Sequence, residues 1–556
     1  MHFDELMKML GEFGRYQKIR FLMVCMFSVV SAWHALNMVF IGAAPAFHCK
    51  TSEFNLSGTP LENLTAEDRL RMLLPEGSSC YQYDLEVVLS GYRSGYKGNL
   101  SEHTMANSSK RVVSCQDGYE FSKADYAETI TSEFSLVCGE KFWIRTSKSV
   151  FFAGRLSGAV IFGQLSDRFG RRPMFFIGCL LLLIAGTVAS FAPNMYVFLP
   201  MYFCQGAAHT GAFLVAYTLS TELVGPRYRV FAGFVSQSFY SIGFMTLAGM
   251  AYLIREWRYL EMAITFPVIL FSLYWWFLPE SIRWLLSHGK DIEAEKVITQ
   301  AAKENGVEID KNIFKSLKEE SAVASTRNYY FIDCVNTWKM AKLSFNIWFN
   351  WLVNSLVYYG LSLNTENLAG SPYVNFCIAG AVEIPAYAIC ILLLNRVGRR
   401  WPLIISMYMG GIACILSECI PSNSDTATVK IIFAMVGKFG ITASYAIIYL
   451  MAAELFPTVV RSIGMGVASM SARIGGILAP IFLDLQVISK PLPLIVFGSL
   501  SVVAGSLAFL LPEPAGKPLP QTPDDVDGGK SCINVGICRK KRSLKLDTEL
   551  QDKPAL

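Results

Sequence analysis

About twelve apolar runs, each roughly 18–24 residues long, recur along this chain of 556 residues. A run of this length crosses the hydrocarbon core of a bilayer as one α-helix, because a segment in lipid must satisfy its own backbone hydrogen bonds. Only 17% of the residues are charged and 53% are hydrophobic, which is atypical of a soluble protein. We therefore predict an all-α membrane protein with twelve transmembrane helices, at 21–44, 148–166, 173–192, 196–219, 231–253, 260–278, 343–363, 373–394, 402–420, 429–452, 463–486 and 492–511.

One short phrase occurs twice, once in each half of the chain. Residues 163–172 read GQLSDRFGRR, and residues 395–400 read NRVGRR. Further residues recur in the same order: Glu222 and Arg229 return as Glu454 and Arg461, and Pro279-Glu280 returns as Pro512-Glu513. Repetition across two apolar halves is typical of transporters built from repeated helical bundles, so we expect two bundles of six helices.

Basic residues are concentrated on one side of a twelve-helix arrangement. They include Lys8, Arg15, Lys18 and both arginine-rich loops. Because cytosolic loops carry the excess of Lys and Arg, this side and both termini are expected in the cytosol. The net charge of +5 reflects this asymmetry and indicates no nucleic-acid partner. The expected organisation is a cytosolic N-terminus at 1–20, transmembrane helix 1 at 21–44, an extracellular loop at 45–147, helices 2–6 at 148–278, a cytosolic linker at 279–342, helices 7–12 at 343–511 and a cytosolic tail at 512–556.

The polar segment 45–147 has the marks of an extracellular loop domain. Four glycosylation sequons are confined to it, at Asn55, Asn63, Asn99 and Asn107. It also contains four cysteines, which in an oxidising compartment are expected to form two disulfides with three conceivable pairings: Cys49, Cys80, Cys115 and Cys138. The alternative is that these cysteines are buried free thiols.

The sequence contains no motif for direct use of ATP or for hydrolysis. Gly529-Lys530-Ser531 resembles the end of a nucleotide-binding loop, but Asp524 stands where that loop requires its first glycine. HExxH, GxSxG and paired CxxC motifs do not occur either. We therefore expect a protein that is not an enzyme and that uses no cofactor or metal.

The two arginine-rich loops are candidates for a cytosolic gate. Their guanidinium groups can bind helix C-terminal carbonyls and nearby carboxylates, and ion pairs that form and break could latch two conformations. The alternative is that the arginines only anchor the topology. The candidate gate residues are Asp167, Arg168, Arg171, Arg172, Glu222, Arg229, Arg396, Arg399, Arg400, Glu454 and Arg461.

Ionisable residues inside apolar runs are costly in lipid, so they normally face a cavity and mark a substrate or ion path. Glu383 lies beside Pro385 and is a candidate counter-charge for an organic cation, a proton carrier or a structural partner. Arg473 could clamp a substrate carboxylate, or neutralise Glu383 when no substrate is bound. Lys438 lies inside the run 429–452 and is a further candidate for the same reason.

Aromatic residues in run 343–363 recur at helical spacing. Trp351, Asn354 and Tyr358 share one face, and an aromatic face can hold an ammonium group by cation–π attraction. Helix–helix packing is the alternative explanation. Further residues that could complete such a cage are Tyr217, Gln237, Tyr240, Tyr445 and Tyr449. His34 and His209 could bind protons, although satisfied histidines are the simpler interpretation.

Several stretches resemble motifs of the major facilitator superfamily and, within it, of solute carrier family 22, the organic cation, carnitine and organic anion transporters. These stretches are both arginine-rich loops and residues 10–14, 279–286, 382–385 and 453–461. Residues 358–362, 370–385 and 472–480 are most similar to insect-type organic cation transporters. The family's central cavity would then involve Tyr217, Gln237, Trp351, Tyr358, Glu383 and Arg473.

The resemblance implies the major facilitator fold and a polyspecific secondary transporter that works by alternating access in the plasma membrane. Vertebrate organic cation transporters have Asp where this chain has Arg473, whereas the anion and carnitine branches have Arg. We therefore expect organic cations or zwitterions, such as carnitine or amine metabolites, as substrates, with Na⁺ or H⁺ as a candidate coupling ion. An organic anion transporter of the same fold is one alternative, and a receptor or scaffold without transport is another.

Overall fold

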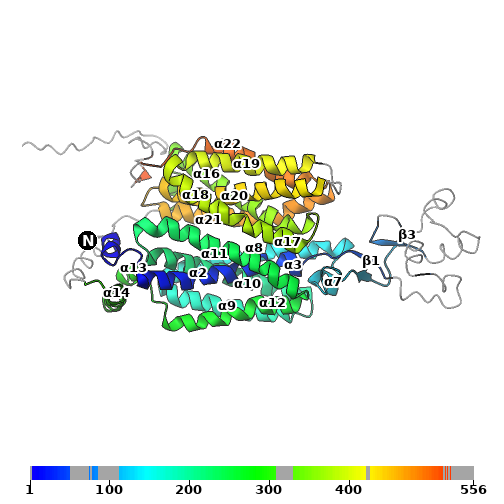
Figure 1. Ribbon diagram of the computed structural model, residues 1–556, viewed down its shortest axis with the longest axis horizontal. Helices are drawn as coiled ribbons and strands as arrows, with labels where there is room; N and C mark the ends of the chain where they lie inside the picture. The colour runs from blue at the N-terminus through cyan, green and yellow to red at the C-terminus, as the bar shows by residue number, and fades with distance from the viewer. Residues whose placement is uncertain are drawn as a thin grey trace, which may run out of the picture.

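The computed structural model describes residues 3–50, 65, 74–75, 78–84, 112–308, 330–420, 426–516, 520, 522–523 and 526. Long helices run side by side along the long axis of the molecule (Figure 1). Helices of the first half, blue to green, lie below those of the second half, yellow to orange.

Twelve helical passes can be followed through the described residues. In the first half they are α2 (Arg15–Leu36) with α3 (Met38–Ile41), α8 (Phe142–Phe169), α9 (Arg171–Ser190), α10 (Met195–Leu223), α11 (Arg229–Leu253), and α12 (Trp257–Thr265) continued by the 3₁₀ helix η3 (Phe266–Trp276). In the second half they are α16 (Trp338–Leu363), α17 (Pro372–Ala381) with α18 (Glu383–Val397), α19 (Arg400–Cys419), α20 (Ala427–Leu455), α21 (Arg461–Leu483) and α22 (Leu492–Ala508).

Eight of these passes are long and apolar enough to cross a membrane by length and composition alone. Helix α22 is apolar but shorter, and α8, α10 and α16 do not meet that criterion. These three helices place polar or charged side chains inside the protein, such as Lys148 on α8, Gln205 on α10 and Asn350 on α16. Such residues lower a helix's hydropathy although they do not face lipid, which explains why composition alone underestimates the number of passes.

The two halves meet along two seams. Helix α8 packs on α21, and α11 packs on α17 and α18. Within the halves, α10 packs on α8 and α9, while α16 packs on α21 and α19 packs on α20 and α22. Residues on α8, α11, α16, α18, α20 and α21 are therefore placed to surround the centre.

One end of the bundle, which we call the motif end, carries both arginine-rich loops with α1 (Phe3–Met9), α13 (Ile282–Ser287) and α14 (Asp291–Asn305) (Figure 1). Helix α14 lies within the segment 279–342, which is expected to link the two halves. It is tied to α2, because Arg20 binds Glu304 and the side chain of Asn305 accepts from the backbone N–H of Tyr16 at 2.9 Å. The hydrogen bond from Arg20 lowers the pKa of Glu304.

The opposite end, which we call the strand end, carries two small antiparallel sheets. Strand β1 (Phe47–Cys49) pairs with β4 (Tyr119–Phe121), and β2 (Tyr81–Tyr83) pairs with β3 (Val112–Ser114). Disulfides join Cys49 to Cys115 and Cys80 to Cys138, which is one of the three conceivable pairings. The sequons at Asn55, Asn63, Asn99 and Asn107 lie outside the described residues.

The disulfide pairing can be tested by peptide mapping. Digestion of the native protein without reductant is expected to yield peptides that link Cys49 to Cys115 and Cys80 to Cys138. Replacing both cysteines of one pair by serine is expected to cost about 2–4 kcal/mol, because the crosslink restricts the unfolded chain. Peptides that link Cys49 to Cys80 or to Cys138 would contradict this topology.

Candidate functional site

The centre of the molecule contains a buried ion pair. Glu383 and Lys438 have 0% and 2% of their surfaces exposed, and Glu383 Oε1 lies 2.9 Å from Lys438 Nζ. The hydroxyl of Ser241 on α11 donates to the other carboxylate oxygen at 2.7 Å. Since Glu383 and Lys438 belong to the second half and Ser241 to the first, this carboxylate connects the two halves.

Local sequence explains the position of Glu383. Helix α17 ends at Ala381 and α18 begins at Glu383, so the predicted span 373–394 is interrupted at Val382. Pro385 lies in the first turn of α18, where a missing N–H costs least. The carboxylate consequently lies at a helix start, where the helix dipole also favours negative charge.

The ammonium group of Lys438 lies against an aromatic face. It is 3.4 Å from the ring centroid of Tyr358 and 5.3 Å from that of Phe244, and it donates to Ser362 Oγ at 2.6 Å. One of the two roles offered for Arg473, neutralisation of Glu383, is not observed in this conformation, because Lys438 on the neighbouring helix α20 takes that place. Which residue pairs with Glu383 depends on how α20 and α21 are rotated about their axes. The spacing of residues along one apolar run does not reveal that rotation.

Arg473 lies on α21 and donates to the backbone carbonyl and the hydroxyl of Ser469. Arg155 on α8 lies opposite in the first half, with Nη1 2.7 Å from the hydroxyl oxygen of Tyr359 and Nε 3.2 Å from Thr210 Oγ1. Sequence reasoning missed Arg155, although an arginine inside the apolar run 148–166 is a signal that could have found it.

The predicted aromatic residues form a continuous group. The ring of Trp351 lies 4.9 Å from that of Tyr449 and 6.1 Å from that of Tyr445, and Tyr445 lies 5.8 Å from Tyr358. Tyr449 in turn lies 5.8 Å from Tyr217, which belongs to the first half. These rings line the junction between the halves, from Lys438 toward the motif end.

Three other predicted residues lie around this group. Tyr240 is buried on α11 with no hydrogen-bond partner for its hydroxyl, and Gln237 is partly exposed one turn before Ser241. Asn354 accepts from Ser444 and belongs to packing between α16 and α20.

The two histidines lie within the first half and have polar partners. His34 Nδ1 lies 2.8 Å from Gln205 Nε2, and His209 Nε2 lies 2.7 Å from Ser31 Oγ. Gln205 also donates to Glu261 at 2.6 Å. Glu261 is a second buried carboxylate, which sequence reasoning missed. These groups form a polar network inside one half and not at the junction between the halves.

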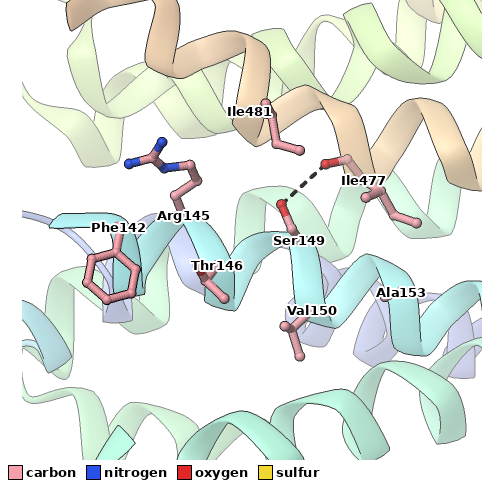
Figure 2. Close-up of a pocket in the computed structure, with 8 residues that line it drawn as sticks. All are labelled: Phe142, Arg145, Thr146, Ser149, Val150, Ala153, Ile477 and Ile481. Atoms are coloured by element: carbon pink, nitrogen blue, oxygen red, sulfur yellow. Dashed lines mark hydrogen bonds between the residues drawn. The ribbon is translucent and has the colours of Figure 1, made fainter. Parts of the chain in front are cut away.

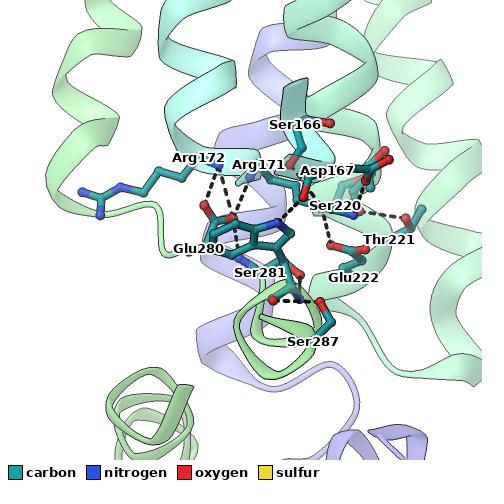
Figure 3. A network of polar contacts seen from close by, with 12 residues as sticks. Ser166, Asp167, Arg171, Arg172, Ser220, Thr221, Glu222, Glu280, Ser281 and Ser287 are labelled. Atoms are coloured by element: carbon teal, nitrogen blue, oxygen red, sulfur yellow. Dashed lines mark hydrogen bonds and ion pairs between the residues drawn. The ribbon is translucent and has the colours of Figure 1, made fainter. Parts of the chain in front are cut away.

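At the motif end, each half contains a network built from the repeated residues. In the first half, Glu280 accepts from the backbone N–H groups of Arg171 at 2.9 Å and Arg172 at 3.1 Å, and so caps α9 (Figure 3). The Arg171 guanidinium lies 3.0 Å from Asp167 and 3.5 Å from Glu222. Burial raises the pKa of Glu280, and the N–H groups of Ser281, Arg172 and Arg171 counteract that rise.

The second half repeats this arrangement. Glu513 accepts from the N–H groups of Arg399 at 2.9 Å and Arg400 at 2.8 Å, and Arg399 Nε lies 2.9 Å from Glu454. Burial acts to raise the pKa of Glu513, but these N–H groups together lower it. Gly170 and Gly398 precede the capped helices with φ of +105° and +92°, and a Cβ at either would collide with the capping carboxylate.

The other predicted gate residues are placed as follows. Arg461 donates to the backbone carbonyl of Phe456 and to Thr458 Oγ1, whereas Glu454 pairs with Arg399. Arg229 begins α11, and Arg168 and Arg396 are exposed. Within the described residues, the ion pairs of Arg171 and Arg399 stay inside one half.

In the part of the chain that the structure describes, two ion pairs join the halves at the strand end. Arg145 on α8 pairs with Asp484, and Lys148 Nζ lies 2.9 Å from Glu366. A pocket of about 470 Å³ lies beside them, lined by Phe142, Arg145, Thr146, Ser149, Val150, Ala153, Ile477 and Ile481 (Figure 2). It follows the seam between α8 and α21 and does not include Glu383.

The helix-capping role of the repeated glutamates is testable. Glu513→Ala is expected to destabilise the protein by about 1–2 kcal/mol, because two N–H groups at the start of α19 lose a charged acceptor. Asp167→Ala is the control, since an exposed carboxylate in such a pair contributes about 0.5 kcal/mol or less. Thermal unfolding of the purified protein measures both, and equal losses would contradict the capping role.

Comparisons with known proteins agree with this architecture. Residues 82–525 match the family described as "Sugar (and other) transporter". The structure resembles that of the inward-open xylose transporter XylE from E. coli, with a TM-score of 0.58 at 14% identity over 91% of this chain and 98% of that chain. This likeness shows the major facilitator fold.

Relatives of higher identity cover nearly the whole chain. The "Organic cation transporter protein" of Drosophila melanogaster is 41% identical over 533 residues, which are 94% of each chain. The human "Organic cation/carnitine transporter 2" is 34% identical over 530 residues, again 94% of each chain. The rat "Solute carrier family 22 member 3" is 33% identical and covers 98% of this chain and 99% of its own.

Proposed function

The chain belongs to the sugar (and other) transporter family, in its solute carrier family 22 branch, and we propose that it is a polyspecific secondary transporter of organic cations and zwitterions. Members of this family are membrane transporters and not enzymes. The observation that supports the substrate class best is the buried carboxylate of Glu383 beside the face of Tyr358, at the junction of the two halves.

In the proposed binding mode, a substrate ammonium group replaces that of Lys438. The lysine ammonium contacts a carboxylate, a hydroxyl and an aromatic face. These are the groups that would attract an organic cation. Cation–π attraction contributes about 2 kcal/mol when it is desolvated. Lys438 is therefore a tethered competitor that neutralises Glu383 while the site holds no substrate.

The proposed mechanism is alternating access, in which the two halves rock around the central site. The motif networks of Arg171 and Arg399 hold the helices of each half together as rigid units. The pairs Arg145–Asp484 and Lys148–Glu366 then latch the strand end and must separate when that end opens. Substrate binding shifts the balance only by its difference in affinity for the two states.

The proposed orientation places the motif end and both termini in the cytosol, with the disulfide-bonded strand end outside the plasma membrane. It rests on the basic loops at one end and the disulfides at the other. Coupling to Na⁺ or H⁺ belongs to the proposal and is tested by varying each ion during uptake.

One screen of substrate uptake distinguishes the proposal from its two alternatives, an organic anion transporter and a receptor without transport. Transport of organic anions is favoured by Arg155 and Arg473, two cations at the centre. Cells that express the chain should take up labelled tetraethylammonium or carnitine above mock-transfected cells. Uptake of p-aminohippurate alone would overturn the assignment to cations and zwitterions, and binding without any uptake would indicate a receptor.

Glu383→Gln is expected to reduce cation uptake by about a hundredfold or more while surface expression persists, because the counter-charge is removed. Glu418→Gln is the matched control, since Glu418 also pairs with a lysine between neighbouring helices of the second half, at 3.1 Å. Normal uptake by the Glu383 variant would refute this role.

Lys438→Met is expected to lower the KM for tetraethylammonium by about tenfold, because a competing ammonium worth some 1.4 kcal/mol is removed. The maximal rate should fall, since Glu383 is then unpaired when the site is empty. Lys430→Met, which breaks the Glu418 pair, should leave KM unchanged. An unchanged or raised KM in the Lys438 variant would contradict the competitor role.

A further inference from the structure

One buried carboxyl group inside the first half has no positive partner. Glu261 lies on α12, one turn from the start of that helix near the strand end, and it is 0% exposed (Figure 1). In the described part of the chain, no lysine or arginine forms an ion pair with it, and Arg258 on the same helix pairs with Glu133. A buried carboxylate without a cation is costly, so Glu261 needs another means of neutralisation.

Two neutral amide groups bind this carboxyl instead. Asn37 Nδ2 donates to Oε2 of Glu261 at 2.7 Å, and Gln205 Nε2 donates to Oε1 at 2.6 Å. The same nitrogen of Gln205 lies 2.8 Å from His34 Nδ1, and Asn37 accepts from the hydroxyl of Tyr202 at 2.8 Å. These five residues, which we call the acid network, join α2, α10 and α12. Burial opposes the ionised form of the carboxyl, whereas the two N–H donors stabilise it.

The amide group of Gln205 is bound at one end only. Its nitrogen contacts Glu261 and His34, while its oxygen is buried with no hydrogen-bond partner. A protonated Glu261 needs an acceptor for its O–H group, and the two ends of an amide have nearly the same shape. When the amide turns over, its oxygen accepts from the Glu261 O–H and from the ring N–H of His34. The acid network therefore has two arrangements that differ by one proton.

Few other ionisable groups face Glu261. Helix α12 packs on α2, α3, α9, α11 and η3, and the acid network adds α10. His34 on α2 and Tyr202 on α10 are the other ionisable members of the network, and His209, one turn from Gln205, binds Ser31 instead. In the described part of these elements, α3, α9, α11 and η3 contribute no ionisable side chain to the network. A change of pH consequently acts on it through the Glu261 carboxyl or the His34 imidazole.

We infer that Glu261 is a proton-binding site inside the first half and that its proton is exchanged for a cationic substrate. The proton comes from bulk water and returns to it, so no co-reactant is required. This inference rests on the proposed function and selects H⁺ from the two candidate coupling ions. Na⁺ fits the site less well, because a hard cation needs several oxygen ligands and the two amides present N–H donors to the carboxyl.

Helix α2 connects the acid network to the central carboxylate. It is hydrogen-bonded to α11 at two points: Ser28 Oγ lies 3.1 Å from Ser236 Oγ, and Trp33 Nε1 donates to Thr246 Oγ1 at 2.9 Å. Ser241, which donates to the central carboxylate, lies between these two points on α11. A rearrangement of the acid network and a substrate at the centre therefore act on the same pair of helices.

The charge of Glu261 sets the direction of the coupling. Its ionised form adds a negative charge to the first half, which favours a cation at the junction of the halves, and a bound proton removes that charge. Coupling between two ligands is reciprocal, so binding of an organic cation favours release of the proton. Cation uptake is therefore expected to be opposed by protons outside and favoured by protons inside.

The first test measures labelled tetraethylammonium uptake at constant membrane potential. In cells that express the unaltered chain, uptake is expected to rise about threefold or more as the external pH is raised from about 6 to about 8. Glu261→Gln resembles the neutral acid and should give a flat profile, whereas Glu261→Asp keeps a carboxyl and should keep a rise. Glu256→Gln is the control and should also keep it, because Glu256 is partly exposed just before the same helix and its side chain makes no capping bond.

Three results of this test contradict the inference. A flat profile in the unaltered chain excludes exchange with protons. A rise that persists in Glu261→Gln assigns the proton to another group, such as His34. Uptake that requires Na⁺ and does not respond to pH assigns the coupling to Na⁺.

A direct measurement of protonation separates failure of the proton site from failure of the proposed function. The infrared C=O band of protonated carboxyl groups is recorded on the purified protein as the pH is raised. Part of this band is expected to disappear, and that part should be absent in Glu261→Gln, shifted in frequency in Glu261→Asp and retained in Glu256→Gln. If tetraethylammonium uptake is lacking but this part is present, the transport proposal fails and the proton site stands. Identical titrations of Glu261→Gln and the unaltered protein would overturn the site.

Discussion

The contact of Glu383 with Lys438 and Ser241 is the interaction on which the centre of this protein depends. A carboxylate inside a bilayer-spanning bundle needs a positive partner and a hydrogen-bond donor, and here the two come from different halves. The same contact that neutralises the charge therefore also holds the halves together. In the proposed binding mode, a ligand that replaces Lys438 would bind the same carboxylate through which Ser241 connects the halves.

The repeated motifs have a different physical role. Glu280 and Glu513 each accept from the first N–H groups of a helix, and Arg171 and Arg399 reach back to carboxylates of the same half. These bonds stabilise helix starts and the packing of each half at the motif end. Pairs between the halves lie at the strand end, at Lys148 and Glu366. Within the described residues, the ion pairs of Arg171 and Arg399 thus join helices of one half, whereas those of Arg145 and Lys148 join the two halves.

Sequence reasoning found residues whose chemistry conflicts with an apolar run, such as Glu383 and Arg473, and it found the aromatic face of Trp351 and Tyr358. Of the two roles that it offered for Arg473, neutralisation of Glu383 is not observed in this conformation, because the partner depends on which face α20 and α21 turn toward α18. It also overlooked Arg155, which lies in a run whose ends are already rich in charge. Cysteine pairing was left open for a similar reason, since spacing within the loop does not determine which strands pair.

The sequence by itself determined the number of helical passes, their repetition in two halves, the family and the residue types available to a central site. These properties are local or compositional, so they depend on runs, spacing and motifs along one chain. The tertiary structure alone decided that Lys438 neutralises Glu383, that Glu280 and Glu513 cap helices, and that Arg155 donates to Tyr359 across the two halves. The physical reason is that contacts between helices depend on the rotation and register of packed neighbours, and a single helix does not specify either.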